Sequence, residues 1–237
     1  METDTNLDRR DALKTIAASA LLCAGMPQSW LSAKPAYAMG KADIPQGIQK
    51  VEGDVTINGI PAKAGDQVSS GDVIVTGKNS LAIFVFEDSA CMMKENSKLI
   101  VKNSDKTAES GKLINALRLM DGKLLSVFGS GSKTVETPTA YIGIRGTGIY
   151  IEVDHEKTYI CTCYGKVLIS PAADKEKQES ITAKHHEAPR YVYGTNIIKQ
   201  APMLNHTDAE LTMLEALVGR IPPFGANSGK KDEKNGY

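Results

Sequence analysis

Apolar residues recur at every second position through the middle of this chain, and glycines interrupt them at short intervals. This is the period of a half-buried β-strand, because successive side chains of a strand point to opposite faces. The alternating runs lie at residues 51–57, 73–75, 81–86, 99–101, 124–128, 149–153, 159–160 and 167–169. Short strands separated by turn residues are typical of a sandwich or a roll. The pattern therefore predicts an all-β, double-layer β-sandwich or roll, with no helix between residues 47 and 169.

Two runs give more detail about this sheet. Asn58-Gly59 follows the first run, and this dipeptide strongly favours a two-residue hairpin turn. The run at residues 81–86 is apolar at every position, as expected of a strand that is covered on both faces.

The end of the chain predicts one short helix within residues 206–221. Thr207 and Glu210 have the spacing of a capping box, in which each side chain binds the other's backbone amide. Leu211, Leu214, Leu217 and Val218 follow at helical spacing and form one apolar stripe. Gly219 is a suitable residue to end this helix. The stripe either docks on the β-domain or binds a partner.

The first 38 residues have the layout of an export signal. Arg9 and Arg10 precede a moderately apolar stretch at residues 16–26, and Ala36-Tyr37-Ala38 has the form of a cleavage site. The arginine pair resembles the twin-arginine (Tat) signal of bacteria, which implies a periplasmic protein. A buried amphipathic N-terminal helix is the alternative. No stretch approaches the 18 apolar residues of a membrane span, so we expect no span after signal removal.

These observations predict a sequence of segments along the chain. After the signal at 1–38 come a linker at 39–46, a β-domain at 47–170 and a β extension at 171–205. The helix at 206–221 and a disordered tail at 222–237 follow. The chain carries 28 Lys and Arg against 28 Asp and Glu. This balance argues against nucleic acid as a partner, because such binding needs a net or clustered basic surface.

Cysteines and histidines gather in the second half of the chain. Cys161-Thr162-Cys163 lies within an expected strand, so both sulfurs should point to one face. His185-His186 follows after the polar segment 171–180, and a hairpin through that segment would bring Cys163 and His186 nearly opposite each other. Thiolate and imidazole are ligands that zinc and copper prefer. The four residues therefore predict a site for zinc, copper or haem. The alternative is that the cysteines are buried apolar residues or disulfide partners, and the histidines are surface or packing residues.

Four ordered motifs carry a resemblance to a known family. They are Gly71-Asp72-Val73-Ile74-Val75-Thr76-Gly77, then Leu119-x-x-Gly122-x-Leu124, then Thr137-Pro138-Thr139-Ala140 with Ile144-Arg145-Gly146-Thr147, and finally Gly165-x-Val167. Together they resemble the FecR domain over about residues 47–170. The resemblance implies a periplasmic β-domain that senses a signal, which FecR proteins relay to a sigma factor through an N-terminal cytoplasmic segment. Since an export signal occupies that place here, we expect this chain to share the binding module of FecR proteins but not their regulation of a sigma factor.

Arg145 is the candidate binding residue of the most specific motif. Its guanidinium has five donors and either contacts an anionic ligand or ties neighbouring loops together. Gly146 beside it permits the positive φ of a sharp turn.

The sequence therefore favours an exported, non-catalytic FecR-like module that recognises a partner protein or another ligand, with a role in envelope signalling. The second hypothesis is a metal- or haem-binding protein that uses Cys161, Cys163, His185 and His186. An enzyme has the least support, because the chain shows no phosphate-binding glycine loop, no H-E-x-x-H and no recognisable catalytic triad order.

Overall fold

The computed structural model describes residues 44–102 and 114–225. The predicted signal and almost all of the predicted tail lie outside these ranges. The strands are β1 (Gly47–Glu52), β2 (Val55–Ile57), β3 (Ile60–Pro61), β4 (Val73–Thr76), β5 (Leu81–Phe86), β6 (Ser89–Met93), β7 (Ser97–Lys102), β8 (Ala116–Val127), β9 (Ser132–Glu136), β10 (Ala140–Val153), β11 (Lys157–Pro171), β12 (Glu179–Ala183), β13 (Arg190–Tyr193) and β14 (Ile198–Gln200). One helix, α2 (Asp208–Leu217), follows them.

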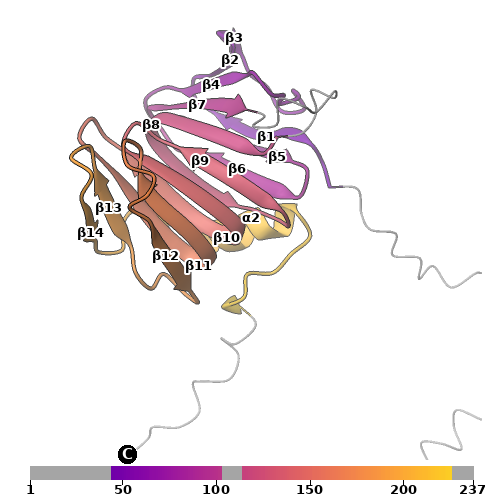
Figure 1. The fold of residues 1–237 in the computed structure, drawn as a ribbon. Helices are drawn as coiled ribbons and strands as arrows, with labels where there is room; N and C mark the ends of the chain where they lie inside the picture. The colour runs from indigo at the N-terminus through magenta and orange to yellow at the C-terminus, as the bar shows by residue number, and fades with distance from the viewer. Residues whose placement is uncertain (1–43, 103–113, 226–237) are drawn as a thin grey trace, which may run out of the picture. The chain divides into compact units, whose positions relative to one another are not determined.

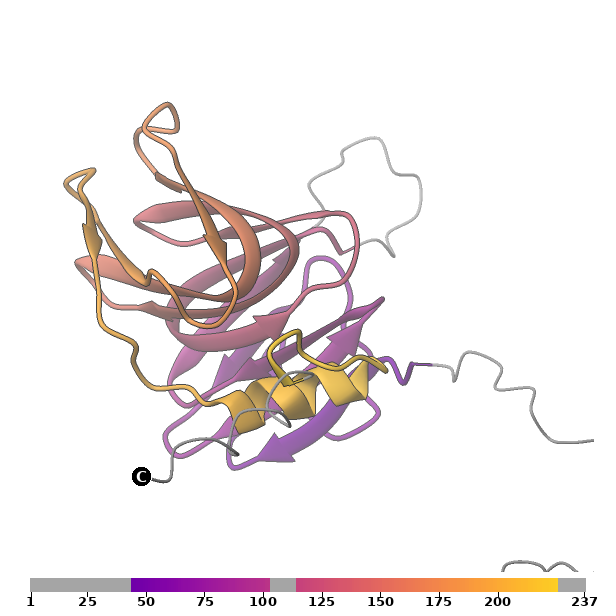
Figure 2. The same cartoon turned by 90° about the horizontal axis from the view of Figure 1, so that it is seen from below.

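All of these strands belong to one hydrogen-bonded sheet that curls over itself into two layers (Figures 1 and 2). Its main path runs β14-β13-β11-β10-β9-β8-β7-β4-β2-β3. Strands β6, β5 and β1 branch from β8, and β12 pairs with β11. The first half of β8 pairs with β7 and its second half with β6 and β10, so this long strand passes from one layer into the other.

The predicted hairpin at Asn58-Gly59 connects β2 and β3. Both residues have positive φ, 53° and 79°, as a type I′ turn requires. The register Ile57↔Ile60 leaves only these two residues in the loop.

The prediction of short strands was wrong for β10 and β11. Residues 149–153, 159–160 and 167–169 are parts of two strands of 14 and 15 residues. Gly146, Gly148 and Gly165 do not end these strands, because they lie at bulges where the register between β10 and β11 shifts. Ile142 and Ile144 before the shift face the same core as Ile149 and Ile151 after it. The bulge therefore keeps the apolar side of a bent strand directed inward.

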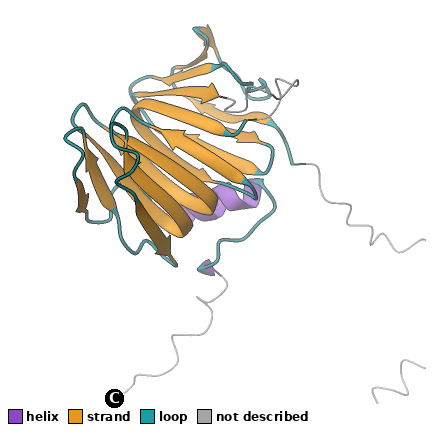
Figure 3. Ribbon diagram, viewed as in Figure 1, coloured by secondary structure: helices purple, strands orange, loops and turns teal. Residues whose placement is uncertain are grey.

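Two apolar cores share the strands of the sheet. The larger core lies between the two layers and takes side chains from strands throughout the sheet. The smaller core lies on the outer face of β5, β6, β8, β10 and β11, where Leu211, Leu214 and Val218 of the α2 segment cover it (Figure 3). The apolar stripe of the predicted helix thus docks on the β-domain.

The predicted fold class is confirmed: the described chain is an all-β double-layer roll with one short helix near its C-terminus. Within residues 47–102 and 114–169 no helix occurs. The helix starts at the predicted capping box, in which Glu210 N–H binds the Thr207 hydroxyl and Thr207 N–H binds the Glu210 carboxylate. None of the helices in the described ranges has the length and apolar character needed to cross a membrane.

Candidate functional site

Two cysteines and two histidines from three separate segments meet under the start of α2. Cys161 and Cys163 belong to β11, His186 lies in the connection between β12 and β13, and His206 precedes the helix cap. Their candidate ligand atoms all lie within 4.8 Å of one another. Both cysteines are 0% exposed, and the His206 residue is 5% exposed. We call these four residues the Cys2His2 cluster.

The second of the two cysteines lies at a bulge in β11, whereas Cys161 pairs regularly with Tyr150. Thr162 pairs with Ile149 and Tyr164 pairs with Gly148, so Cys163 between them has no partner residue on β10. Because of this extra residue, Tyr164 enters the same core as its neighbour Cys163, against the usual alternation of a strand. Both sulfurs enter the smaller core on the outer face of the sheet, as the C-x-C spacing predicted.

The predicted hairpin between β11 and β12 is confirmed. Gly165 pairs with Ala183, and the His186 N–H donates to the Cys163 carbonyl at 2.9 Å. His186 has φ of 55°, a left-handed conformation that is uncommon for a residue with a side chain. Such outliers persist where the surrounding structure holds them, often at functional sites. This conformation accompanies the entry of the imidazole into the cluster.

Each imidazole of the cluster has one nitrogen engaged outside it. His186 Nε2 lies 2.8 Å from Asp208 Oδ1, and His206 Nδ1 lies 2.5 Å from the Leu204 carbonyl oxygen. The other nitrogens point inward: His186 Nδ1 is 3.0 Å from His206 Nε2 and 3.6 Å from Cys161 Sγ. The ring of His206 also stacks on Tyr150, with the ring centroids 4.5 Å apart.

The surroundings shift the pKa values of the cluster in opposite directions. A hydrogen bond from Cys163, aided by His186 and His206, lowers the pKa of the Cys161 thiol against the effect of burial. Burial raises the pKa of Cys163 well above its usual range, and the neighbouring Cys161 adds to this. Burial alone would lower the pKa of His186, but hydrogen bonds to Cys161 and Asp208 outweigh it and raise the pKa. Cys161 is therefore the thiol more readily deprotonated.

The sequence hypothesis placed His185 in this site and omitted His206. In the structure His185 points to the protein surface, where its side chain is 48% exposed and its Nε2 lies 2.8 Å from Asp208 Oδ2. The two imidazoles lie side by side, with ring centroids 4.8 Å apart, and both contact Asp208, but only His186 also reaches Cys161 Sγ. The one signal for His206 in the sequence was its position directly before the capping residue Thr207, since a docked helix start brings that position onto the sheet.

Cys91, the third cysteine in the described part of the chain, lies apart from the cluster. It is fully buried on β6, and its Sγ lies 3.1 Å from the Ser126 hydroxyl oxygen. Burial raises the pKa of this thiol to about 12. All three described cysteines are free thiols, and Cys91 has the surroundings of a buried apolar residue.

Arg145 lies on an exposed part of the sheet beyond the bulge. It pairs directly across the strands with Lys166, and both side chains are exposed. None of the ion pairs in the described ranges includes either of them. Like charges directly opposite on paired strands repel each other. The same face carries Leu168, which is 40% exposed, and these residues line an open groove of about 660 Å³. We call it the Arg145 groove.

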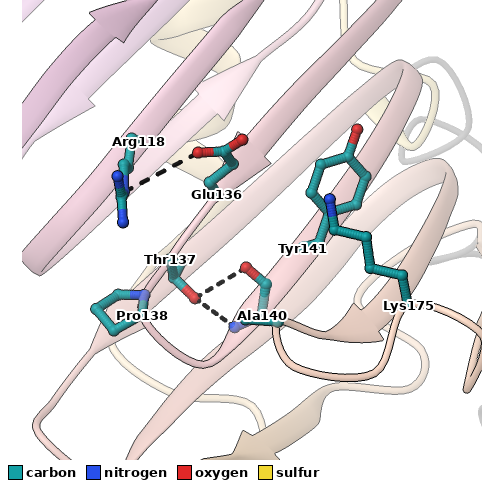
Figure 4. Close-up of a pocket in the computed structure, with 8 residues that line it drawn as sticks. Arg118, Glu136, Thr137, Pro138, Ala140, Tyr141 and Lys175 are labelled. Atoms are coloured by element: carbon teal, nitrogen blue, oxygen red, sulfur yellow. Dashed lines mark hydrogen bonds and ion pairs between the residues drawn. The ribbon is translucent and has the colours of Figure 1, made fainter.

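The Thr137-Pro138-Thr139-Ala140 motif forms a tight connection between β9 and β10 (Figure 4). The Thr137 hydroxyl accepts from Ala140 N–H at 2.8 Å, and it lies 2.7 Å from the buried Thr158 hydroxyl. The pocket beside the motif holds only about 230 Å³, less than a usual ligand pocket. We assign the motif a structural role.

Comparisons with known proteins find a family that is similar to one segment of the chain. Two crystal structures of a protein described as an anti-sigma factor from Parabacteroides distasonis match at 12% identity, with TM-scores of 0.45 and 0.43. These matches cover 60% and 54% of this chain and 64% and 58% of theirs, which is less than two thirds of their length. No curated protein matches. Residues 72–168, from the start of β4 to near the end of β11, match the FecR protein family, so the predicted resemblance is confirmed over that segment.

Proposed function

We propose that this protein is an exported, non-catalytic FecR-like module that recognises a partner protein in bacterial envelope signalling. The FecR match over residues 72–168 supports the type of module. The twin-arginine pattern at Arg9 and Arg10 supports export to the periplasm. The partner-binding part of the proposal rests on one observation: Arg145 and Lys166 of the Arg145 groove have no acidic partner among the described residues.

The groove fits an acidic segment with at least one apolar side chain. Arg145 and Lys166 lie opposite each other without an acidic partner among the described residues, so an anionic segment would relieve their repulsion. Lys133 also lines the groove, but its ammonium is held by Glu87 at 2.5 Å. Leu168 offers the apolar contact. Charge complementarity of this kind selects partners and speeds their encounter.

A site-specific crosslink in the native host tests this proposal. A photoreactive residue at position 168 should give a discrete adduct with an envelope protein in the periplasmic fraction. The same residue at Ile60, which is 70% exposed on β3 at the other end of the sheet order, is the matched control. Arg145→Glu with Lys166→Glu should reduce the adduct at least about tenfold, because attraction becomes repulsion.

Lys78→Glu is the control for charge reversal outside the groove, because Lys78 is exposed in the turn between β4 and β5. This substitution should leave the adduct unchanged. An adduct that forms equally at Ile60, or that survives reversal of both groove cations, would refute the groove as the partner site. A protein confined to the cytoplasmic fraction would refute the export part of the proposal.

A further inference from the structure

The geometry of the Cys2His2 cluster points to a tetrahedral zinc site, and we propose that Cys161, Cys163, His186 and His206 bind one Zn²⁺ ion. The inference does not depend on the partner-binding proposal. It differs from the sequence hypothesis in its fourth ligand, which is His206 and not His185.

Hydrogen bonding outside the cluster fixes which ring nitrogens carry protons. A carboxylate and a carbonyl oxygen only accept, so His186 Nε2 donates to Asp208 and His206 Nδ1 donates to Leu204. In the neutral imidazoles, His186 Nδ1 and His206 Nε2 then both carry lone pairs. These lone pairs face each other across 3.0 Å. Two acceptors at this distance repel unless a proton or a cation lies between them.

The spacing of the inward atoms suits a metal ion. Zinc bonds of about 2.3 Å to sulfur and about 2.0 Å to nitrogen in a tetrahedron place a nitrogen and a sulfur ligand roughly 3.5 Å apart, and two nitrogens roughly 3.3 Å apart. The observed separations are 3.6 Å between His186 Nδ1 and Cys161 Sγ and 3.0 Å between the two imidazole nitrogens. All four ligand atoms lie within 4.8 Å of one another, so side-chain movements of up to about 1 Å would bring the remaining pairs to tetrahedral spacing.

The second partners of both imidazoles match those of metal-binding histidines. Such histidines almost always donate their other N–H to a carboxylate or a backbone carbonyl, which fixes the ring and raises its basicity. Here Asp208 does this for His186, and the Leu204 carbonyl does it for His206. Asp208 is thus a positioning residue for the proposed site.

The charge of the proposed ion is balanced by its ligands. Binding of Zn²⁺ would displace one proton from each thiol, and two thiolates would neutralise the ion in a buried place where net charge is costly. Four protein ligands leave no open position, which is the arrangement of a structural zinc site. A catalytic thiol is disfavoured, because Cys161 is 0% exposed although His186 and Asp208 follow it in a chain of contacts. The ion would join β11, the connection after β12 and the start of α2.

Metal content of the full-length protein, purified without a histidine tag under reducing conditions from zinc-replete medium, tests the proposal. Elemental analysis should find one zinc per chain. Cys163→Ser and His206→Ala should each lose it. His185→Ala and Cys91→Ser are controls that should retain it: His185 contacts Asp208 but contributes no atom to the Cys2His2 cluster, and Cys91 contacts Ser126 instead. Asp208→Asn should retain the ligands but weaken zinc affinity about 10- to 100-fold.

Two further measurements keep the test independent of how well the variants fold. In the parent protein, Co²⁺ in place of zinc should give the thiolate charge-transfer absorption of a tetrahedral site. Zinc should also slow hydrogen exchange in residues 202–214, and a chelator should reverse this. A folded, reduced parent protein that takes up no zinc, a bound copper ion in place of zinc, or loss of zinc on His185→Ala with retention on His206→Ala would each overturn the proposal.

Discussion

Gly165 lies where the backbones of β10 and β11 approach too closely for a side chain. It has φ of +91°, and a Cβ placed on it would lie 2.6 Å from the Gly146 carbonyl oxygen. Gly65 has almost the same φ, +93°, but no atom lies within 4 Å of the place that its Cβ would take. We expect Gly65→Ala to cost about 1–2 kcal/mol from backbone strain alone. Gly165→Ala should cost about 2–5 kcal/mol, because overpacking adds to the same strain.

Urea unfolding of the two variants beside the parent protein measures this difference. Equal losses of stability would contradict the tight approach of the two strands at this bulge, since only the steric contribution separates the two positions.

At the residue scale, part of the candidate site could be predicted from the sequence. The C-x-C spacing and the polar segment 171–180 were enough to bring Cys161, Cys163 and His186 together. The sequence could not choose between His185 and His186, because their directions depend on the left-handed backbone at His186. It also could not place His206, since that required knowing where the helix docks.

At the scale of elements, α2 is held mainly by its apolar stripe. Leu214 is 0% exposed in the smaller core, whereas Met213 beside it is 37% exposed. We expect Leu214→Ala to lower the free energy of unfolding by about 2–5 kcal/mol through lost burial and a cavity. Met213→Ala should change it by less than about 0.5 kcal/mol, because surface substitutions seldom matter. Thermal or urea unfolding gives both values, and similar small effects would mean that the helix is not docked.

The elements also show which sequence signals were decisive. The period of two located the strands, because burial of one face of a strand requires it. The capping box at Thr207 located the helix, because the first backbone amides of a helix need hydrogen-bond partners. Glycine was the ambiguous signal. At Gly59 it forms a hairpin turn, but at Gly146 and Gly165 it permits a bulge within a continuous strand. A positive φ serves both purposes, so composition alone does not distinguish a strand end from a bend.

At the scale of the whole described molecule, one sheet separates two cores. Adjacent residues of β10 face opposite sides: Tyr150 enters the smaller core, and Ile149 and Ile151 enter the larger one. Polar contacts add to this connection. The buried Glu215 of α2 accepts from Tyr164 of β11 and from Arg220 Nε at 2.6 Å, and Arg220 also donates to the Asp88 carbonyl at 2.6 Å. Neither core can come apart without exposing strands that the other core needs.

This shared sheet predicts a single cooperative unfolding transition, and two optical probes separate the cores. Four tyrosines, Tyr150, Tyr159, Tyr164 and Tyr191, lie in or against the smaller core, so near-ultraviolet circular dichroism reports mainly on the helix side. Far-ultraviolet circular dichroism reports mainly on the strands. Because both cores depend on β10 and β11, the two signals should change with the same midpoint and slope in urea. If near-ultraviolet signal is lost at lower urea while the strand signal persists, α2 undocks as a separate unit. The two cores would then unfold independently, even though they share strands in the folded protein.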